Sequence, residues 1–234
     1  MDKKKYITFF HLLLEIDWIK TLRFNVHYFK LRDSLKMPVW IFRRTTFNKL
    51  EGSVQLMSHL HPGMVRIGVH NVGSKDGNSS RTVWHIAGHV LFGDHVSIGR
   101  GTGISVSATG ELRFGNGFVQ NGASEFICHN NITFGDNCLV SWDVLMMDTD
   151  LHYVLDSDNR QVNTPKPIHI GSHVWIGCRS TILKGVSIAE DTIIASGSTI
   201  SKSCERKNIV LLGSPDGNRI LKENVFWSNQ GVFS

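Results

Sequence analysis

The chain has 234 residues, of which 41% are hydrophobic and 19% charged, and its formal net charge is +5. This length suffices for one large domain with its own core, or for a domain with an appendage. No stretch reaches the roughly 18 uninterrupted apolar residues of a membrane-spanning helix. No Gly-rich phosphate loop, nucleic-acid recognition module or aromatic platform is visible, which disfavours nucleotide hydrolysis and nucleic-acid binding.

Residues 1–60 differ from the rest of the chain in charge and periodicity. Apolar residues recur there at spacings of three and four, which predicts an amphipathic helix ending near Lys20 and Arg23. These residues are Phe9, Leu12, Leu13, Ile16, Ile19 and Leu22. We therefore expect a short, mainly helical and basic N-terminal segment over residues 1–60. The simpler interpretation is a packed cap with a solvated basic face, and the alternative is peripheral contact with an anionic membrane.

Two features predict a cytoplasmic location. Residues 3–5 are lysines before an apolar run, as in a signal peptide, but Glu15 and Asp17 interrupt the run and no small-residue cleavage site follows. The cysteines show neither a metal-ligand nor a disulfide spacing, and Cys128 and Cys138 fall on inward positions of the repeat described next. We expect core thiols in a reducing compartment, with contact at the inner face of the membrane left open.

A six-residue repeat dominates the C-terminal part of the chain. Isoleucine recurs at positions 170, 176, 182, 188, 194 and 200. In a helix, six steps rotate a side chain by roughly 240° and would scatter these residues, whereas in extended chain they point the same way if each turn keeps register. Residues two places earlier should also point inward: Ile168, Val174, Ser180, Val186, Thr192 and Ser198. This hexapeptide pattern is typical of a parallel β-helix.

The same spacing continues upstream, with one irregularity. It includes Phe92, Ile98 and Ile104, then Cys128, Phe134, Val140 and Met146. Between residues 105 and 127 the phase slips, which predicts a bulge or an irregular coil near Phe114. We predict an all-β solenoid over residues 61–222 and a C-terminal tail over 223–234.

The repeat is suspended once, over residues 147–167, and resumes at Ile168. An insertion that leaves the scaffold undisturbed often carries function. This one contains His152 with two nearby carboxylates, Asp148 and Asp150. A histidine held by a carboxylate can act as a general base near neutral pH.

Other histidines do not suggest a metal site. His85 and His89 stand four apart as in a zinc helix, but isoleucine replaces the catalytic glutamate and the surroundings indicate a strand. His59 and His61 lie beside a proline turn and are expected to be exposed. We expect no metal ligands and no metal requirement.

Several runs resemble the hexapeptide-repeat acyltransferases, over roughly residues 90–222. They are residues 174–177, 182–186, 195–202 and 213–215. Ser141-Trp142-Asp143 followed by the His152 loop is similar to the O-acetyltransferases found with bacterial capsule and lipopolysaccharide gene sets. The resemblance implies a left-handed parallel β-helix, a homotrimer with active sites between subunits, and acetyl-CoA as donor.

The resemblance also implies roles for individual residues. His152 would be the base, with Asp148 or Asp150 either orienting it or stabilising a turn. Trp175 would line the cleft beside the loop or pack as a corner aromatic. Backbone amides of Ala195, Ser196, Gly197 and Ser198 would bind the pantetheine. Ser201 and Lys202 would approach the nucleotide end, with Arg219 or Lys222 as phosphate partners, the alternative being that these basic residues are solvated surface charges. Where such proteins carry Pro-Ala-Lys, this chain has Pro215-Asp216-Gly217, which puts a lysine contact to CoA there in doubt, and an acidic residue would repel a phosphate that it faced.

The function expected on these grounds is acetyl transfer from acetyl-CoA to a sugar hydroxyl of a surface polysaccharide or its precursor. Within the enzyme class, N-acylation of an amino sugar and transfer of a longer acyl chain stay open, because general-base chemistry is common to all. Outside it, the alternative is a non-catalytic trimeric β-helix that binds a glycan or acts as a scaffold.

Overall fold

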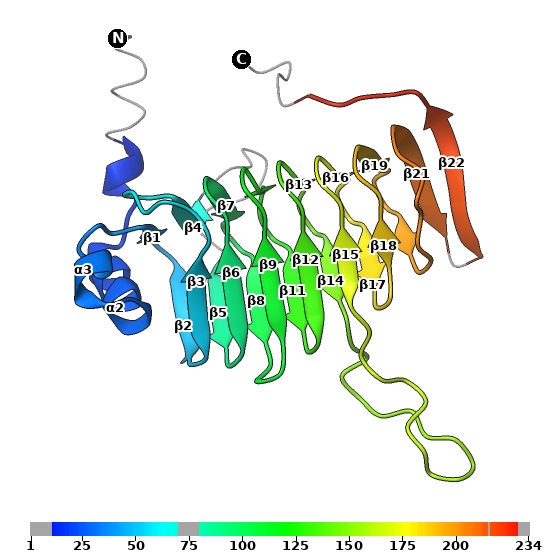
Figure 1. Ribbon diagram of the computed structural model, residues 1–234, viewed down its shortest axis with the longest axis horizontal. Helices are drawn as coiled ribbons and strands as arrows, with labels where there is room; N and C mark the ends of the chain where they lie inside the picture. The colour runs from blue at the N-terminus through cyan, green and yellow to red at the C-terminus, as the bar shows by residue number, and fades with distance from the viewer. Residues whose placement is uncertain (1–10, 70–79, 215, 229–234) are drawn as a thin grey trace.

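Each turn of the chain contributes one strand to each of three sheets, and the turns stack along one axis (Figure 1). The computed structural model describes residues 11–69, 80–214 and 216–228. Within these residues all strand pairs are parallel except β21 with β22, which form an antiparallel hairpin. This is the coiled parallel β-helix predicted from the six-residue spacing.

The described strands divide among the sheets as follows. The first sheet contains β1 (Val39–Ile41), β4 (Val65–Val69), β7 (Val96–Gly99), β10 (Val119–Gln120), β13 (Leu139–Val140), β16 (Trp175–Ile176), β19 (Thr192–Ile194), β21 (Ile209–Ser214) and β22 (Gly217–Glu223). The second contains β2 (Thr45–Leu50), β5 (Thr82–Ile86), β8 (Gly103–Val106), β11 (Glu125–Cys128), β14 (Leu145–Met147), β17 (Thr181–Leu183) and β20 (Thr199–Ile200). The third contains β3 (Ser53–Leu56), β6 (His89–Phe92), β9 (Glu111–Phe114), β12 (Asn131–Phe134), β15 (Ile168–Ile170) and β18 (Ser187–Ile188).

The core is a column of inward side chains in register from coil to coil. All six repeat isoleucines and all six residues two places before them are buried, as predicted. Upstream the column is aromatic: the rings of Phe92 and Phe134 stack on the two sides of Phe114, with centroids 5.4 and 5.7 Å away. Cys128 and Cys138 are buried as expected, and burial raises the pKa of the Cys138 thiol to about 11 and that of Cys128 further.

The predicted irregularity between residues 105 and 127 is a longer turn and not a bulge. Residues 107–110 connect β8 to β9, and Gly110 donates its amide to the carbonyl of Ser107. The pairing of β8 with β11 and of β9 with β12 continues without a register shift. The extra residues therefore leave the strand pairing unchanged and shift only the sequence positions at which inward residues recur.

The N-terminal segment contains helices, as predicted, but they cover a shorter range than residues 1–60. Asp17 accepts a hydrogen bond from the Lys20 amide (3.1 Å) and caps α2 (Trp18–Tyr28), and α3 (Leu31–Ser34) follows. The prediction of one helix that contains both Ile16 and Leu22 is therefore wrong, because Ile16 forms a β-bridge with Phe42. The predicted start of that helix, Phe9, lies outside the described residues. The expectation of mainly helical structure to residue 60 is also wrong, since residues 39–56 form β1, β2 and β3.

Helix α2 closes the N-terminal end of the core. Its Asn25 donates to the Val39 carbonyl (2.7 Å) and accepts from the Val39 amide (3.2 Å), so the helix is tied to the first strand. Phe24 packs edge-on against Trp84, with ring centroids 5.1 Å apart. In the described part of the chain, no helix has the length and apolar character needed to cross a membrane.

Candidate active site

Residues 148–167 leave the β-helix between β14 and β15 and project away from its body (Figure 1). His152 lies on this loop with an exposed side chain. Its amide donates to the carbonyl of Asp150 (2.7 Å), and its carbonyl accepts from the side-chain amide of Asn163 (2.7 Å). The backbone of His152 is therefore held on both sides while its ring faces solvent.

Three side chains, Asp150, Asn163 and Lys184, form what we call the loop brace. The carboxylate of Asp150 accepts from Asn163 Nδ2 (2.8 Å) and from Lys184 Nζ, and Lys184 also donates to the Asn163 carbonyl (3.1 Å). The hydrogen bonds from Lys184 and Asn163 lower the pKa of Asp150. Since Lys184 belongs to β-helix residues and Asn163 to the returning arm of the loop, the brace fastens both arms to the body.

Asp148 is a buried turn carboxylate at the root of the loop. Its two oxygens accept the amides of His129 (2.7 Å) and Asn130 (2.8 Å), in the turn between β11 and β12. Among the described residues, neither Asp148 nor Asp150 is hydrogen-bonded to the ring of His152. Both carboxylates therefore stabilise the structure of the loop, and neither is seen to orient the imidazole of His152.

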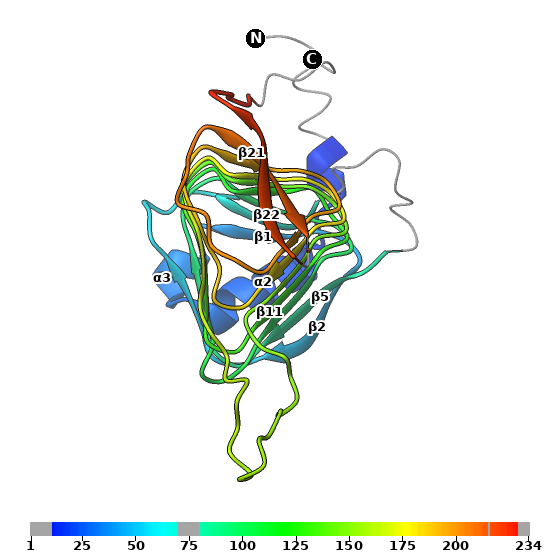
Figure 2. The ribbon, with the colours of Figure 1, turned by 90° about the vertical axis from the view of Figure 1, so that its right-hand side faces the viewer.

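Trp175 lies on β16, in the first sheet, and the loop leaves the corner between the second and third sheets. These are opposite sides of the triangular cross-section (Figure 2). Trp175 donates its indole N–H to Ser141 Oγ (3.1 Å). Topology separates Trp175 from the loop of its own chain, so its place in a cleft beside the loop stays a prediction about neighbouring copies of the chain.

The C-terminal segment adds an aromatic residue that sequence analysis missed. The ring of Trp227 stacks on His173 (4.4 Å, 11°) and lies 6.1 Å from the ring of Trp175. His173 Nδ1 in turn lies 2.8 Å from Asp191 Oδ1. No spacing in the sequence links residue 227 to residue 175, since the chain runs through the hairpin β21–β22 before it returns over the coils.

The residues expected to bind the cofactor lie around the last coils. The amides of Ala195 and Gly197 donate to the carbonyls of Leu211 (2.8 Å) and Cys178 (2.9 Å) within the coils, and the role of these residues toward pantetheine stays a prediction. The amides of Ser196 and Ser198 are the other candidates of that turn.

Ser201 and Lys202 are exposed, next to the hairpin. Lys202 Nζ lies 3.5 Å from the carbonyl oxygen of Asp216, and the Lys202 carbonyl accepts from Asn218 (2.7 Å). Arg219 and Lys222 are exposed on β22 of the same hairpin. The three cations thus lie at one end of the β-helix, although the Asp216 carboxyl group is part of the same turn.

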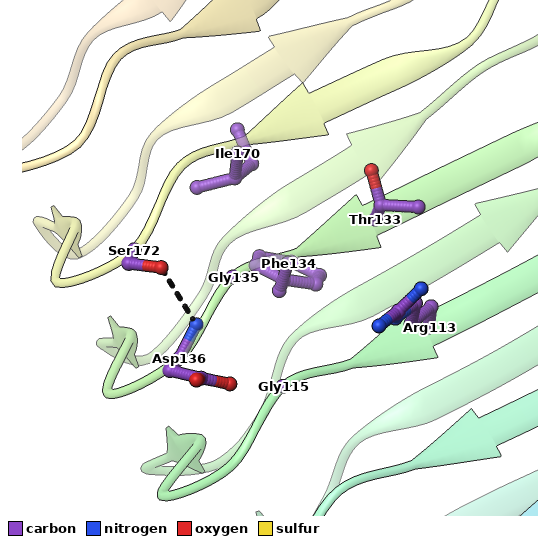
Figure 3. Close-up of a pocket in the computed structure, with 8 residues that line it drawn as sticks. All are labelled: Arg113, Gly115, Thr133, Phe134, Gly135, Asp136, Ile170 and Ser172. Atoms are coloured by element: carbon purple, nitrogen blue, oxygen red, sulfur yellow. Dashed lines mark hydrogen bonds between the residues drawn. The ribbon is translucent and has the colours of Figure 1, made fainter. Parts of the chain in front are cut away.

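A separate shallow pocket of about 420 Å³ opens where the third sheet turns into the first (Figure 3). Phe134 and Ile170 belong to the buried core beneath it, and Arg113 and Asp136 line its polar side. The amide of Asp136 donates to the hydroxyl of Ser172 (3.1 Å). Its lining includes neither the histidine of the loop nor the tryptophan of β16, so it is not part of the candidate active site.

Comparison with known proteins identifies the repeat. Residues 167–202 match the family model of the bacterial transferase hexapeptide (six repeats). The chain is 30% identical over 114 residues to the galactoside O-acetyltransferase of Escherichia coli K12, a match covering 48% of this chain and 54% of that protein. It is 32% identical over 99 residues to the polysialic acid O-acetyltransferase of Escherichia coli O1:K1, covering 42% of this chain and 31% of that protein. The chain thus spans about half or less of these relatives.

Among solved structures, the polysialic-acid-specific acetyltransferase NeuO aligns with a TM-score of 0.55. The alignment covers 81% of this chain and 92% of that one at 21% identity, which shows a shared fold. The predicted left-handed parallel β-helix of hexapeptide repeats is confirmed, and so is the resemblance to hexapeptide-repeat acyltransferases over the matched residues.

Proposed function

We propose that this chain, which carries the bacterial transferase hexapeptide repeat, is an acetyl-CoA-dependent O-acetyltransferase acting on a sugar hydroxyl of a surface polysaccharide or its precursor. The observation that carries the proposal is a histidine on a braced loop that projects from a transferase-type β-helix. The O-acetyltransferase names of both relatives support the acyl group and the acceptor class.

The mechanism is a direct transfer with His152 as general base. The imidazole removes the proton of the acceptor hydroxyl as its oxygen attacks the thioester carbonyl. The tetrahedral intermediate then collapses, the C–S bond breaks, and the imidazolium returns the proton to the CoA thiolate. Because a sugar hydroxyl is a poor nucleophile at neutral pH, base assistance of this kind contributes about 10²- to 10⁴-fold, and joint binding of donor and acceptor adds to it.

The loop brace supplies orientation in this mechanism. It fixes the backbone of His152 through the carbonyl of Asp150 and the side chain of Asn163, while Lys184 holds both to the body. The buried carboxylate of Asp148 keeps the root of the loop in place by accepting two backbone amides. Within the part of the chain that the structure describes, the base is thus positioned through its backbone, and no carboxylate is hydrogen-bonded to its ring.

We place the reaction between two copies of the chain. Trp175 and His152 lie on opposite sides of one β-helix, so a cleft that contains both requires the loop of one copy to reach the first sheet of another. A closed ring of three copies would give each loop such a partner, in keeping with the homotrimer implied by the family resemblance. Acetyl-CoA would then extend from Trp175 along the turns at Ser196 and Ser198 to Lys202.

The deciding experiment is thiol release from acetyl-CoA by the purified chain, over a panel of sugars and nucleotide sugars. His152→Ala should lose about 10²- to 10⁴-fold of the acceptor-dependent rate with unchanged thermal stability. His59→Ala, an exposed histidine at the other end of the β-helix, is the matched control and should retain the rate. Full activity in His152→Ala would refute the assignment of the base.

Thermal stabilisation by CoA separates this function from its alternatives. A specific ligand present at 100 times its dissociation constant adds about 2.7 kcal/mol to stability. Stabilisation without turnover on hydroxyl acceptors would favour N-acylation of an amino sugar, to be tested with amino-sugar acceptors and longer acyl donors. Absence of both stabilisation and turnover would favour the glycan-binding or scaffold module.

We also propose that α2 contacts an anionic membrane surface. The exposed face of the helix carries Ile19, Leu22 and Val26, which are 83%, 50% and 52% exposed. Arg23 and His27 flank this apolar row. Apolar side chains beside basic ones suit the boundary between acyl chains and anionic head groups, where two weak signals combine.

A further inference from the structure

Outside the candidate active site, three potential metal ligands from two distant segments converge at one corner of the β-helix. His61 lies in the connection between β3 and β4, and Asp94 and His95 lie in the turn between β6 and β7. One ligand atom from each lies within 4.8 Å of the other two. His61 Nε2 is 2.7 Å from Asp94 Oδ1, and His95 Nε2 is 3.6 Å from Asp94 Oδ2.

Both ring nitrogens of His61 face oxygen acceptors at this corner. Its Nδ1 lies 3.3 Å from the carbonyl oxygen of Pro62, while its Nε2 faces the carboxylate of Asp94. Both partners are acceptors, and a neutral imidazole has only one N–H to donate. With Nδ1 directed at the Pro62 carbonyl, Nε2 lies beside the carboxylate, which is the arrangement in which a metal ion can be shared by the two.

A second imidazole lies close enough to share the ion. The ring centroids of His61 and His95 are 5.3 Å apart, and both rings lie beside the Asp94 carboxylate. One divalent ion satisfies both nitrogens and the carboxylate at once. A hydrogen bond donated by Nδ1–H to a backbone carbonyl is also the usual second contact of a metal-binding histidine, because it fixes the ring and leaves Nε2 as the ligand.

The backbone holds the carboxylate and His95 in position. Asp94 Oδ1 accepts the amide of His95 (2.7 Å), and the Asp94 amide donates to Asn116 Oδ1 (2.9 Å). His95 has φ of 54°, a left-handed conformation that histidine adopts more readily than most residues. The side chains of His61 and Asp94 are 38% and 29% exposed, whereas that of His95 is 74% exposed and free to rotate onto an ion.

We propose that His61, Asp94 and His95 bind one divalent transition-metal ion of the zinc class. Two imidazoles and one carboxylate with solvent as the fourth ligand form a common tetrahedral set for Zn²⁺, and nitrogen ligands disfavour Mg²⁺ and Ca²⁺. At ligand distances of about 2.1 Å, neighbouring donor atoms are about 3.4 Å apart, so the 2.7 Å contact of His61 with Asp94 has to open on binding, whereas the 3.6 Å contact of His95 with Asp94 is already near this spacing. The ion would join segments 33 residues apart in sequence and strengthen the N-terminal coils, and it takes no part in acyl transfer.

The test is Zn²⁺ titration of the full chain by calorimetry after removal of bound metals with a chelator. We expect one Zn²⁺ per chain, a rise in Tm with Zn²⁺, and a visible absorption band with Co²⁺ as the spectroscopic probe of tetrahedral geometry. Mg²⁺ should not compete. Absence of Zn²⁺ binding, or equal competition by Mg²⁺, would overturn the proposal.

Three variants remove the ligands one at a time: His61→Gln, Asp94→Asn and His95→Asn. Asparagine at 94 keeps an acceptor for the backbone amide of residue 95, and asparagine at 95 tolerates positive φ, so these two should fold as the parent does. Each should weaken Zn²⁺ binding at least tenfold and abolish the Co²⁺ band. His59→Gln is the matched control and should bind as the parent does. Unchanged affinity in Asp94→Asn and His95→Asn would place the zinc elsewhere and refute the site.

Discussion

The β-helix and the loop at residues 148–167 are held by different forces. In the β-helix, every coil buries apolar side chains in register with the coils on both sides, as Phe92, Phe114 and Phe134 do. The loop buries almost nothing beyond Asp148 and Thr149, and is held by that carboxylate and by the loop brace. Stability should therefore depend on the first part and chemistry on the second, and each can be disturbed separately.

The largest loss of stability is expected from the aromatic column. Phe114→Ala leaves a cavity between two stacked rings and should lower the free energy of unfolding by about 3–5 kcal/mol, measured by chemical denaturation. Arg113→Ala changes an exposed neighbour on the same strand and should stay within about 0.5 kcal/mol. A loss below about 1 kcal/mol in Phe114→Ala would mean that the coils close around the missing ring and that the column is not a rigid stack.

An intermediate effect is expected at the root of the loop. Asp148→Asn leaves one of the two backbone amides without its acceptor at a buried side chain, and should cost about 1.5–3 kcal/mol because the lost hydrogen bond is to a charged group. Asp156 is the matched control: it also accepts two amides, those of Asp158 and Arg160, but on the exposed tip of the loop. Asp156→Asn should cost less than about 1 kcal/mol, and equal costs at the two sites would contradict the role of burial.

The brace should affect turnover more than stability. The side chains of Lys184 and Asp150 are 20% and 45% exposed, so Lys184→Met should cost only about 0.2–1 kcal/mol. Turnover should fall about 10- to 100-fold, because His152 loses its fixed position. Lys166→Met, on the returning arm, is the control and should leave turnover within about twofold of the parent. Loss of stability without loss of turnover would contradict the assignment of stability to the β-helix and of chemistry to the loop.

The ion pair of Lys184 and Asp150 predicts that stability falls as the pH is lowered. Lys184 and Asn163 lower the pKa of Asp150 in the folded chain. Its ionised form therefore contributes stability above the unfolded pKa of about 3.9, and this contribution disappears as pH falls through the lower folded value. In Lys184→Met the pKa of Asp150 should return toward its usual range, which a carboxyl ¹³C NMR titration would detect. An unchanged titration would mean that Asn163 alone sets the pKa.

Periodic burial explains what the sequence could predict. The isoleucine spacing predicted the inward face of the coils because a two-residue alternation carries through every turn that keeps register. The insertion at residues 147–167 was visible as an interruption of that spacing. The N-terminal helix was misplaced because Asp17, which looked like a break in an apolar run, is the N-cap of the helix that follows.

Contacts between distant segments explain what the sequence could not predict. Trp227 meets Trp175 only because the chain reverses at a hairpin, and His61 meets Asp94 only because one coil lies above the other. His59 is exposed as expected, whereas His61 is half-buried against a carboxylate, contrary to expectation. No spacing relates such residues, since inserted residues vary in number between coils.

The smallest effect on folding is expected at the exposed face of α2, which belongs to neither part. Deletion of residues 1–60 would remove β1, β2 and β3 and uncover the core, so substitutions are the sharper test. Ile19→Ser with Leu22→Ser should leave stability and turnover unchanged and lower sedimentation with anionic phosphatidylserine liposomes by roughly tenfold. Leu155→Ser with Val162→Ser removes loop side chains 52% and 60% exposed and should sediment as the parent does. Equal partitioning of all three proteins would reject the membrane contact, because exposed apolar area alone would then not explain binding.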